Sequence, residues 1–341
     1  MAADPAPTSL PTTVLTGFLG SGKTTLLRRA LASPAFADTA VIVNEIGEIA
    51  IDHHLVDYVE GAVLELPGGC LCCAVREDLA RTLRDLFDRR DAGEIRAFRR
   101  VVIETTGLAD PAPILFTLGA DIALDGRLHL GRVVTVVDAV TGADALARFP
   151  EAARQAALAD ALVISKTDLA APPPALEAAL AALNPNAERI IGAAASNPGS
   201  VMFASARRPA TESPPTEPTA VHSHGIDSFA VILAGAMTRL DFARTLGGLA
   251  SERGTDLLRV KGIVEFSDRP GRPAVVQGAQ HAIFPPEWLD DWPDSDRRSR
   301  LVFIVHDIPR NEILARFAFA APELTGVRAS RPHAHTEPVS D

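Results

Sequence analysis

The segment that decides the fold of this chain is GFLGSGKT, residues 17–24. It follows the apolar pair Val14-Leu15 and precedes the helix-like run TLLRRAL at 25–31. The spacing matches G-x-x-x-x-G-K-[S/T], and a strand before it with a helix after it is the context that a phosphate-binding P-loop requires. Glycines let the backbone curl with positive φ, so that successive N–H groups face an anion at a helix N-terminus. The alternative is a glycine-rich turn that only joins two elements.

This segment predicts a site for a nucleoside triphosphate and Mg²⁺. Lys23 is expected to reach the β- and γ-phosphates, and the Thr24 hydroxyl is expected to ligate Mg²⁺. The residues expected to bind the nucleotide here are Gly17, Gly20, Ser21, Gly22, Lys23, Thr24 and Thr25. The fold class that follows is α/β, a P-loop NTPase with a mainly parallel sheet flanked by helices.

A second part of the site is predicted where the apolar run at 101–103 ends. Glu104 follows this run directly, and Gly107 lies three residues further on. A carboxylate at the end of such a strand lies where P-loop proteins hold the Mg²⁺ shell, and a glycine lets its N–H approach the γ-phosphate. We therefore expect Glu104 and Gly107 to complete a catalytic set with Lys23 and Thr24.

Further acids follow the predicted strand at 40–43. Glu45 and Glu48 lie just past its end, on the ligand side of an open α/β sheet. They are predicted to belong to a switch segment near Mg²⁺ or a second metal, and ordinary solvated loop acids are the alternative. Asp138 ends another predicted strand, at 132–138, where capping of the next turn is favoured over a functional role.

The sequence SKTD at 165–168 predicts which base is bound. In GTPases an Asn-Lys-x-Asp segment at this place in the α/β order recognises guanine, because its aspartate accepts two hydrogen bonds that adenine cannot donate. Lys166 and Asp168 are expected to take these roles here. Ser165 replaces the usual asparagine and is expected to loosen the loop. The alternative is a surface salt bridge between Lys166 and Asp168.

All three cysteines lie in one tetrapeptide, CLCC at 70–73. Cys70, Cys72 and Cys73 precede or open a predicted amphipathic helix at 78–87, and a helix N-terminus favours the metal-binding thiolate. Three soft donors can hold one tetrahedral ion and leave a fourth position for exchange. Zn²⁺ is the expected ion, with Co²⁺ as the alternative. A redox sensor and inert buried cysteines are the other interpretations.

Composition limits the class of protein. The net charge is −10 without a basic cluster, which argues against nucleic-acid binding. No run of about 18 apolar residues occurs, and the start MAADP lacks the features of a signal peptide, so we expect no membrane span and a cytoplasmic location. At 341 residues the chain is long enough for two domains.

The expected organisation follows from composition and periodicity. It comprises a disordered N-terminus at 1–12, a nucleotide-binding domain at 13–205, a proline-rich linker at 206–224, a smaller α+β domain at 225–331 and a disordered tail at 332–341. Four histidines lie in the linker and tail, where solvated residues are expected and metal capture is the alternative: His222, His224, His333 and His335.

The ordered series GFLGSGKTTLL, NEIGEIAID, GGCLCC, ETTGLADP, VVDA, QAALAD and SKTDL resembles the CobW family of P-loop GTPases over nearly the whole chain. This family comprises cytosolic metallochaperones related to the nickel-insertion GTPases of hydrogenase and urease. The resemblance implies a GTP–Mg²⁺ site with Glu104 in place of the usual aspartate. It also implies a metal, most often zinc, at Cys70, Cys72 and Cys73, and a C-terminal domain that makes partner or regulatory contacts.

Two functions from different classes remain open at this point. The first is a GTP-hydrolysing metallochaperone with slow intrinsic turnover, which delivers zinc, or cobalt for cobalamin biosynthesis, to a client metalloprotein. The second is a small-molecule kinase or ATPase whose cysteines sense redox state. A zinc store without turnover is a binding-only variant of the first. The sequence names neither the client nor the oligomeric state.

Overall fold

The structure is a computed structural model of the chain. It describes residues 9–43, 63–65, 72–121, 124, 126–191, 197–204, 224–233, 235 and 237–318, with the backbone alone at 63–65, 72–78, Ala120 and Pro198. Residues 1–8 of the predicted disordered N-terminus, the whole predicted tail at 332–341, nearly all of the linker, and His222 lie outside these residues. His333 and His335 belong to that tail. The predicted disorder was wrong at residues 10–12, because they pair with neighbouring strands as the start of a strand at Leu10–Gly17.

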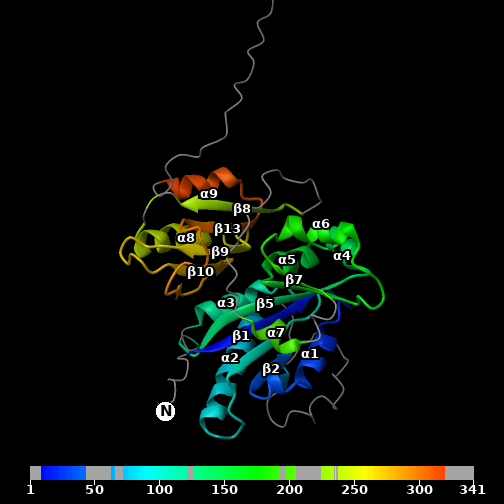
Figure 1. Cartoon of the computed structure of the whole chain (residues 1–341). Coiled ribbons are helices and arrows are strands. Elements are labelled where there is room, and N and C mark those ends of the chain that lie inside the picture. The colour runs from blue at the N-terminus through cyan, green and yellow to red at the C-terminus, as the bar shows by residue number, and fades with distance from the viewer. Residues whose placement is uncertain are drawn as a thin grey trace, which may run out of the picture.

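The first domain is built on a seven-stranded parallel sheet, which confirms the predicted fold class (Figure 1). The strand order is β3-β2-β4-β1-β5-β6-β7, and every neighbouring pair is parallel. The central strands are buried over most of their length, as in sheets covered on both faces. The strands are β1 (Leu10–Gly17), β2 (Thr39–Val43), β3 (Val63–Glu65), β4 (Arg100–Glu104), β5 (Leu128–Asp138), β6 (Ala161–Ser165) and β7 (Glu188–Ile191).

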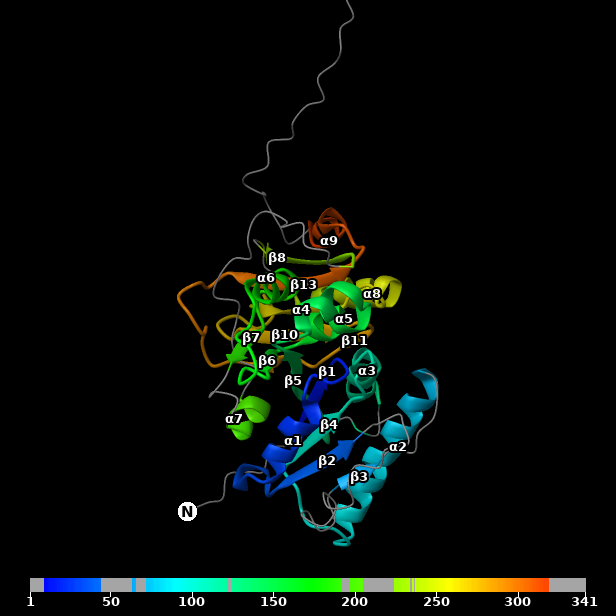
Figure 2. The ribbon, with the colours of Figure 1, turned by 90° about the vertical axis from the view of Figure 1, so that its right-hand side faces the viewer.

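Helices cover both faces of this sheet. Figure 2 shows α2 and α3 on one face and α1 and α7 on the other. The helices are α1 (Lys23–Leu31), α2 (Cys72–Asp91), α3 (Ala112–Ala120), α4 (Gly142–Arg148), α5 (Pro150–Leu158), α6 (Pro174–Leu183) and α7 (Pro198–Phe203), with a short 3₁₀ turn η1 (Pro34–Phe36) after α1. Because all neighbouring strands are parallel, their carboxyl ends lie at the same edge of the sheet.

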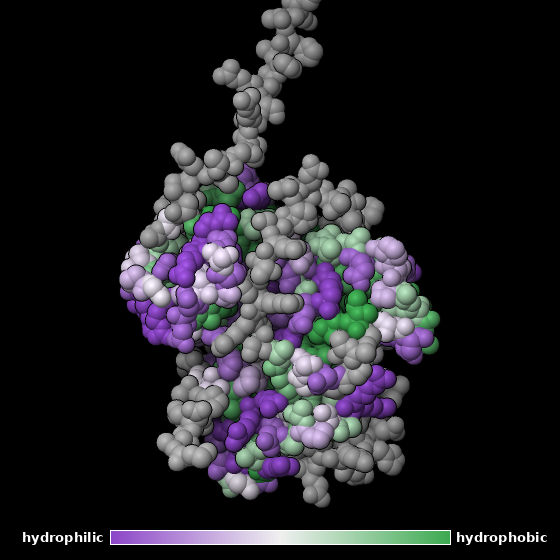
Figure 3. Space-filling view, viewed as in Figure 1, coloured by the Kyte–Doolittle hydropathy of each residue, from purple (hydrophilic) through white to green (hydrophobic). Residues whose placement is uncertain are grey.

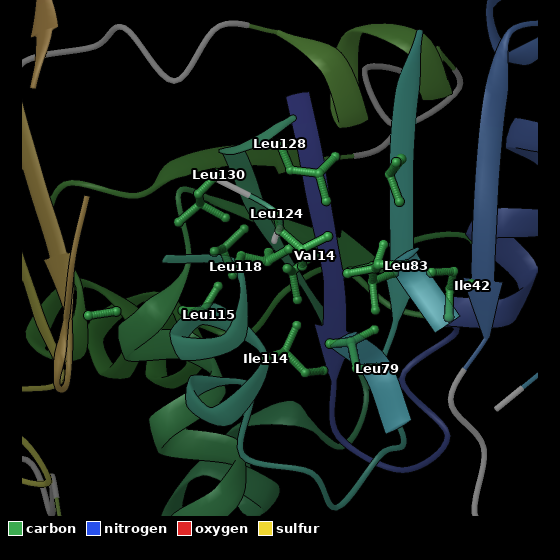
Figure 4. Close-up of a cluster of buried hydrophobic side chains, with 14 of the residues drawn as sticks. Val14, Ile42, Leu79, Leu83, Ile114, Leu115, Leu118, Leu124, Leu128 and Leu130 are labelled. Atoms are coloured by element: carbon green, nitrogen blue, oxygen red, sulfur yellow. The ribbon is translucent and has the colours of Figure 1, made fainter. Parts of the chain in front are cut away.

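The core beneath α2 and α3 arises from helical spacing of apolar residues. Leu79 and Leu83 lie on one face of α2 and meet Val14 of β1 (Figure 4). Leu115 of α3 closes the cluster from the side of β5, and all four side chains are fully buried. This packing fixes α2 and α3 against each other and against the strand that leads into the segment GFLGSGKT.

Five helices, α3 to α7, and the strand β7 lie where the sequence analysis named no element. Four of these helices, α3, α5, α6 and α7, carry proline in their first turn. Proline is favoured there because its missing N–H would have no helical partner. This start signal could have located them. Periodicity is a weak guide here, because α5 and α6 are alanine-rich and α7 has only six residues.

The second domain is an antiparallel sheet with two helices, as the predicted α+β class requires. The sheet order is β11-β10-β9-β13-β8, and β12 pairs with β10. Its strands are β8 (Ile226–Leu233), β9 (Arg259–Val264), β10 (Ala274–Ala279), β11 (Ala282–Ile283), β12 (Glu287–Trp288) and β13 (Ser299–His306), and its helices are α8 (Arg239–Arg253) and α9 (Arg310–Arg316).

This second sheet carries apolar packing on both faces. Along β13, Leu301, Phe303 and Val305 join the cluster that contains side chains of α8 and α9. The intervening Ile304 joins a cluster with α5 and α6 of the first domain, because successive side chains of a strand point to opposite faces. Near the other edge, Phe284 packs into the core beneath α3. The two domains therefore share continuous hydrophobic packing.

A buried ion cluster joins the same two domains. Asp160, which follows α5, accepts hydrogen bonds from Arg259 at 2.5 Å and Lys261 at 2.8 Å, both on β9. The Asp160 side chain is 5% exposed, and its second oxygen accepts the Val133 N–H of β5 at 2.9 Å. One carboxylate thus ties the sheet of the first domain to the sheet of the second.

The charge of Asp160 is stabilised by this arrangement. Burial alone raises its pKa, but the charges of Arg259 and Lys261 outweigh burial and hold the pKa well below its usual value. Because the folded-state pKa is depressed, the carboxylate contributes stability at pH values above about 4, and that contribution is lost as the pH falls through the folded-state pKa. Burial also lowers the pKa of Lys261, which Asp160 only partly offsets.

Replacement of Asp160 by Asn should destabilise the protein strongly, because it leaves Arg259 and Lys261 buried without their anion. We expect a loss of about 3–5 kcal/mol in the free energy of unfolding, measured by urea denaturation at pH 7. The control is Asp290→Asn, which removes the exposed pair with Arg272 and should cost less than about 1 kcal/mol. Equal losses in the two variants would contradict a joining role for Asp160.

Candidate functional site

The site begins where β1 ends and the backbone turns into α1. Gly17, Gly20 and Gly22 have φ values of 144°, 70° and 97°, conformations that other residues rarely adopt. A Cβ on Gly17 would overlap the Val136 carbonyl of β5. Gly22 is the N-cap of α1, so the N–H groups at the start of this helix open onto the loop. The backbone therefore curls as the sequence predicts, with the start of α1 open to the loop.

Lys23 lies across this loop. Its side chain is buried, and Nζ donates to the carbonyls of Gly17 at 2.9 Å and Phe18 at 3.3 Å. The ammonium group is thus held over the loop by neutral acceptors. Phosphate oxygens are stronger acceptors for an ammonium group than peptide carbonyls, because both partners are then charged.

Thr24 and Glu104 meet at the centre of the site. The Thr24 hydroxyl donates to Glu104 Oε1 at 2.9 Å, although 80 residues separate them in the sequence. Glu104 is 4% exposed and ends β4, which pairs directly with β1. A hydroxyl and a carboxylate are oxygen donors of the kind that Mg²⁺ prefers. The structure thus brings these two predicted residues into direct contact.

Gly107 lies against the same loop from the other side. A Cβ at Gly107 would meet Leu19 Cδ2 at 2.6 Å and Leu19 Cα at 2.8 Å. A larger residue would therefore push apart the loop after β4 and the loop after β1. Glycine at 107 thus permits close packing of these two loops, and the approach of its N–H to a γ-phosphate stays a prediction.

The loop after β6 is tied to this centre by Ser165. Its hydroxyl donates to the Ser21 carbonyl at 2.5 Å, and the Val137 carbonyl lies 3.3 Å away. The sequence analysis expected serine at this position to loosen the loop, and the structure instead shows a direct bond to the phosphate-binding segment. The serine side chain is short, but Ser165 lies close enough for its hydroxyl to reach the Ser21 carbonyl.

Lys166 and Asp168 differ in their surroundings. Lys166 donates to Asp138 Oδ2 at 2.6 Å and has a φ of 56°, which turns the chain sharply. The Asp168 side chain is exposed and makes no hydrogen bond or ion pair within the described part of the chain. The alternative of a salt bridge between Lys166 and Asp168 is therefore not found, because the Lys166 ammonium group pairs with Asp138 instead.

Asp138 has the capping role that the sequence analysis favoured, together with an unexpected one. It accepts the Val140 N–H at 2.7 Å and the Thr141 hydroxyl at 2.9 Å, and it pairs with Lys166. Burial raises its pKa, but the hydrogen bonds from Lys166, Val140 and Thr141 outweigh burial and lower the pKa overall. A charged Asp138 thereby fixes Lys166 at the mouth of the site.

The predicted metal residues are described only in part. Cys72 and Cys73 form the first turn of α2, so the expectation that the thiols open a helix is confirmed for these two. Their side chains, and Cys70, Glu45 and Glu48 altogether, lie outside the described residues. Within the described residues, His, Cys, Asp and Glu side chains form no cluster of three suited to a metal ion.

Apolar side chains surround the site. Large hydrophobic residues follow the carboxyl ends of four parallel strands, and each is more than half exposed: Leu19, Leu108, Val140 and Leu169. Figure 3 shows hydrophobic surface just below α4 and α6. Nearby, Phe18 stacks on Phe149 with ring centroids 4.7 Å apart. Such an apolar rim suits contact with a base or with another protein.

Sequence reasoning missed one buried polar residue of the site. Gln155 of α5 is fully buried, and its amide donates to the carbonyls of Ala109 at 2.9 Å and Gly107 at 3.2 Å. The only signal was a glutamine within the alanine-rich segment QAALAD. A single amide in such a helix does not reveal which distant loop it contacts.

In the described part of the chain, no helix is long and apolar enough to cross a membrane.

Comparison with known families matches both domains. Residues 11–190 match the CobW/HypB/UreG nucleotide-binding domain, and residues 226–321 match the cobalamin synthesis protein cobW C-terminal domain.

Individual relatives extend this match over nearly the whole chain. The zinc chaperone YjiA of Escherichia coli (strain K12) is 34% identical over 314 residues, which is 90% of this chain and 97% of that protein. The crystal structure of the Zn(II)-bound YjiA GTPase from E. coli superposes with a TM-score of 0.66 at 30% identity, over 92% of this chain and 99% of that one. The zinc-regulated GTPase metalloprotein activator 1 of Schizosaccharomyces pombe (strain 972) is 36% identical over 47% of this chain and 39% of its own length.

Removal of the Ser165 hydroxyl tests the link between the two nucleotide loops. In Ser165→Ala the Ser21 carbonyl loses its donor, which is worth about 1–2 kcal/mol, so we expect about 5- to 30-fold weaker binding of fluorescent GDP. The control is Thr167→Ala, because the Thr167 hydroxyl makes no hydrogen bond with the described residues. Unchanged affinity in Ser165→Ala would show that this bond does not support binding.

Proposed function

This chain belongs to the CobW/HypB/UreG family, and from that premise we propose that it is a GTP-dependent metallochaperone. It binds and slowly hydrolyses GTP, holds zinc at Cys70, Cys72 and Cys73, and delivers the ion to a client metalloprotein under the control of nucleotide state. The observation that carries the nucleotide half of this proposal is the contact between Thr24 and Glu104. The names of the zinc-chaperone and zinc-regulated relatives support the metal half.

The donors present fit a nucleotide-bound Mg²⁺ ion. Thr24 and Glu104 would hold it, since a hydroxyl and a carboxylate already face each other at the end of β4. The ion, when bound, offsets the negative charge of the β- and γ-phosphates. Glu104 also positions the Thr24 hydroxyl by accepting its proton in a hydrogen bond.

Lys23 supplies the positive charge of the protein itself. Its Nζ rests on the Gly17 and Phe18 carbonyls, only one loop away from the N–H groups that open α1. On nucleotide binding it exchanges these neutral acceptors for phosphate oxygens. The positive end of the helix and the curled N–H groups of residues 20–25 then surround the same anion.

Base selection rests on the loop after β6. The exposed Asp168 carboxylate has no competing partner in the described structure and is therefore open to the two donors of the guanine edge. Lys166, fixed by Asp138, places its stem beside the base. Ser165 joins this loop to Ser21, so the base and phosphate parts of the site are held at a constant separation.

The path from nucleotide to metal runs through α3 and α2. Gly107 lies in the segment between β4 and α3, and Asp110 in that segment accepts the Ala112 N–H at 2.9 Å where α3 begins. Leu115 and Leu118 of α3 share a core with Leu79 and Leu83 of α2, the helix that starts at Cys72. Movement of Gly107 toward a γ-phosphate would therefore shift the helix that carries two thiols.

The thiolates suit zinc as cargo rather than as a permanent cofactor. Three protein donors leave one tetrahedral position for a donor from the client. The helix N-terminus favours the thiolate form, so a change at the start of α2 alters how tightly the ion is held. Slow intrinsic hydrolysis keeps the metal bound until the client contributes to turnover. We place this exchange in the cytoplasm, where reduced thiols persist.

Elemental analysis tests the metal site. Purified protein should carry about one zinc ion per chain, and Cys72→Ser should lose it or hold it more weakly, because one of three soft donors is removed. GTP and GDP should give different zinc affinities in the wild type. The control is His129→Asn, which removes an exposed histidine distant from the cysteines in sequence. Equal metal content in the wild type and Cys72→Ser would remove the thiol site from the proposal.

Phosphate release tests the nucleotide site. Both Thr24→Ala and Glu104→Gln should lower GTP hydrolysis by about 100-fold or more, since positioning and electrostatic stabilisation supply most of the catalysis. The control is Thr117→Val, which removes a buried hydroxyl bonded to Pro113 on α3. An equal concentration of ATP should leave fluorescent GDP bound. Displacement by ATP would favour an ATPase or kinase instead.

A further inference from the structure

One buried side chain holds the loop that contains Gly107. Gln155 extends from α5 and donates one amide hydrogen to the Gly107 carbonyl and one to the Ala109 carbonyl. Both partners are acceptors, so the NH₂ group rather than the carbonyl of Gln155 must face them. Arg154, the preceding residue, reaches Asp110 of the same loop at 3.4 Å. Adjacent residues of α5 therefore contact three residues of one loop.

The amide oxygen of Gln155 is unsatisfied in this conformation. Oε1 is buried and has no hydrogen-bond partner among the described residues. A buried acceptor without a donor raises the free energy of the state that contains it. A second arrangement of the loop, in which one of its N–H groups reaches Oε1, would remove this cost. The unsatisfied Oε1 would therefore favour such an arrangement over the one described.

The C-terminal end of α5, one turn after Gln155, is fixed to the second domain. The Leu158 carbonyl, in the last turn of α5, accepts a hydrogen bond from Arg259 of β9. Asp160, two residues on, binds Arg259 and Lys261. Along α5, the face formed by Ala152, Ala153, Ala156 and Ala157 packs in the cluster that includes Leu258 and Ile304 of the second domain. Within a single turn, α5 thus contacts the loop through Gln155 and β9 through Leu158.

We propose that Gln155 is a positioning residue that sets the Gly107 loop for the γ-phosphate, and that α5 transmits the state of this loop to β9 of the second domain. The inference rests on the proposed GTP site and adds its regulation. Small alanines let α5 lie close to its neighbours, so a shift at Gln155 is passed on rather than absorbed by flexible side chains. The C-terminal domain is then the part of the molecule that reports which nucleotide is bound.

Hydrogen exchange of the full chain tests this connection. In the wild type, a non-hydrolysable GTP analogue should slow amide exchange at residues 259–264 by about tenfold relative to GDP, within the usual range of coupling between sites. In Gln155→Leu, which keeps the size of the side chain but removes both donors, this difference should fall below about twofold. Protection of residues 17–31 by either nucleotide should remain at saturating concentration.

The matched control is Thr13→Val. It removes another fully buried hydrogen bond, from β1 to the Met202 carbonyl at 2.8 Å, without touching the Gly107 loop. It should therefore keep the nucleotide-dependent difference at 259–264. Loss of that difference in both variants would point to general loosening and would overturn the specific role of Gln155.

Lys261→Met tests the same connection from the second domain and does not depend on the folding of Gln155→Leu. It retains the Arg259–Asp160 pair. Because coupling between two sites is reciprocal, this variant should change the ratio of the dissociation constants of the GTP analogue and GDP by about threefold or more. Arg272→Met, which breaks an exposed ion pair before β10, should leave that ratio unchanged.

The outcomes separate this inference from the proposed function. If the wild type binds no guanine nucleotide, the proposed function itself fails. If nucleotide protects residues 17–31 but residues 259–264 exchange equally with GDP and the analogue, only the connection through α5 fails. A nucleotide-dependent difference that persists in Gln155→Leu, or an unchanged ratio in Lys261→Met, also overturns it.

Discussion

The parallel alignment of β1, β4, β5 and β6 is the constraint on which the rest of the structure depends. The register pairs Leu15 with Glu104 and Gly17 with Val136, and it pairs Asp138 with Ser165. All four carboxyl ends therefore meet at one edge, as expected for ligand sites in open α/β sheets. A short hydroxyl or carboxylate can then bridge loops that are far apart in the sequence, as Thr24 and Ser165 do.

The same sheet also explains how the site is joined to the remainder of the chain. Its edge supplies loops to the predicted nucleotide site, and its covering helices connect those loops to the rest of the chain. Helix α3 begins where the Gly107 loop ends and packs on α2, whose first residues are Cys72 and Cys73. Helix α5 holds that loop through Gln155 and meets the second domain at Leu158. One loop thus has contiguous contacts toward the thiols and toward the second domain.

The two domains are united by both apolar packing and charge. The Asp160 cluster requires particular partners at hydrogen-bond distance, because a buried charge without its partner is costly. The pairing of Asp160 with Arg259 and Lys261 therefore fixes the register between α5 and β9. A movement of α5 would therefore displace β9 of the second domain through these ion pairs.

The sequence by itself determined the fold class and the segments that form the predicted nucleotide site. Local patterns were sufficient there, because a P-loop is one continuous segment whose glycines, lysine and threonine act through the backbone that they shape. Strand-end positions likewise identified Glu104, Gly107, Lys166 and Asp168, since a buried strand is a continuous apolar run. The cysteine cluster and the order of the motifs in the sequence also indicated the CobW family.

Only the tertiary structure decided which of these residues touch and what holds them. In the structure the Thr24 hydroxyl donates a hydrogen bond to Glu104, and the Ser165 hydroxyl donates one to the Ser21 carbonyl. Lys166 pairs with Asp138 and not with Asp168. The structure also revealed Gln155 and Asp160, whose partners lie 46–48 and 99–101 residues away. Such contacts leave no periodic signal, because they depend on where helices come to rest on a sheet rather than on the spacing of neighbours along the chain.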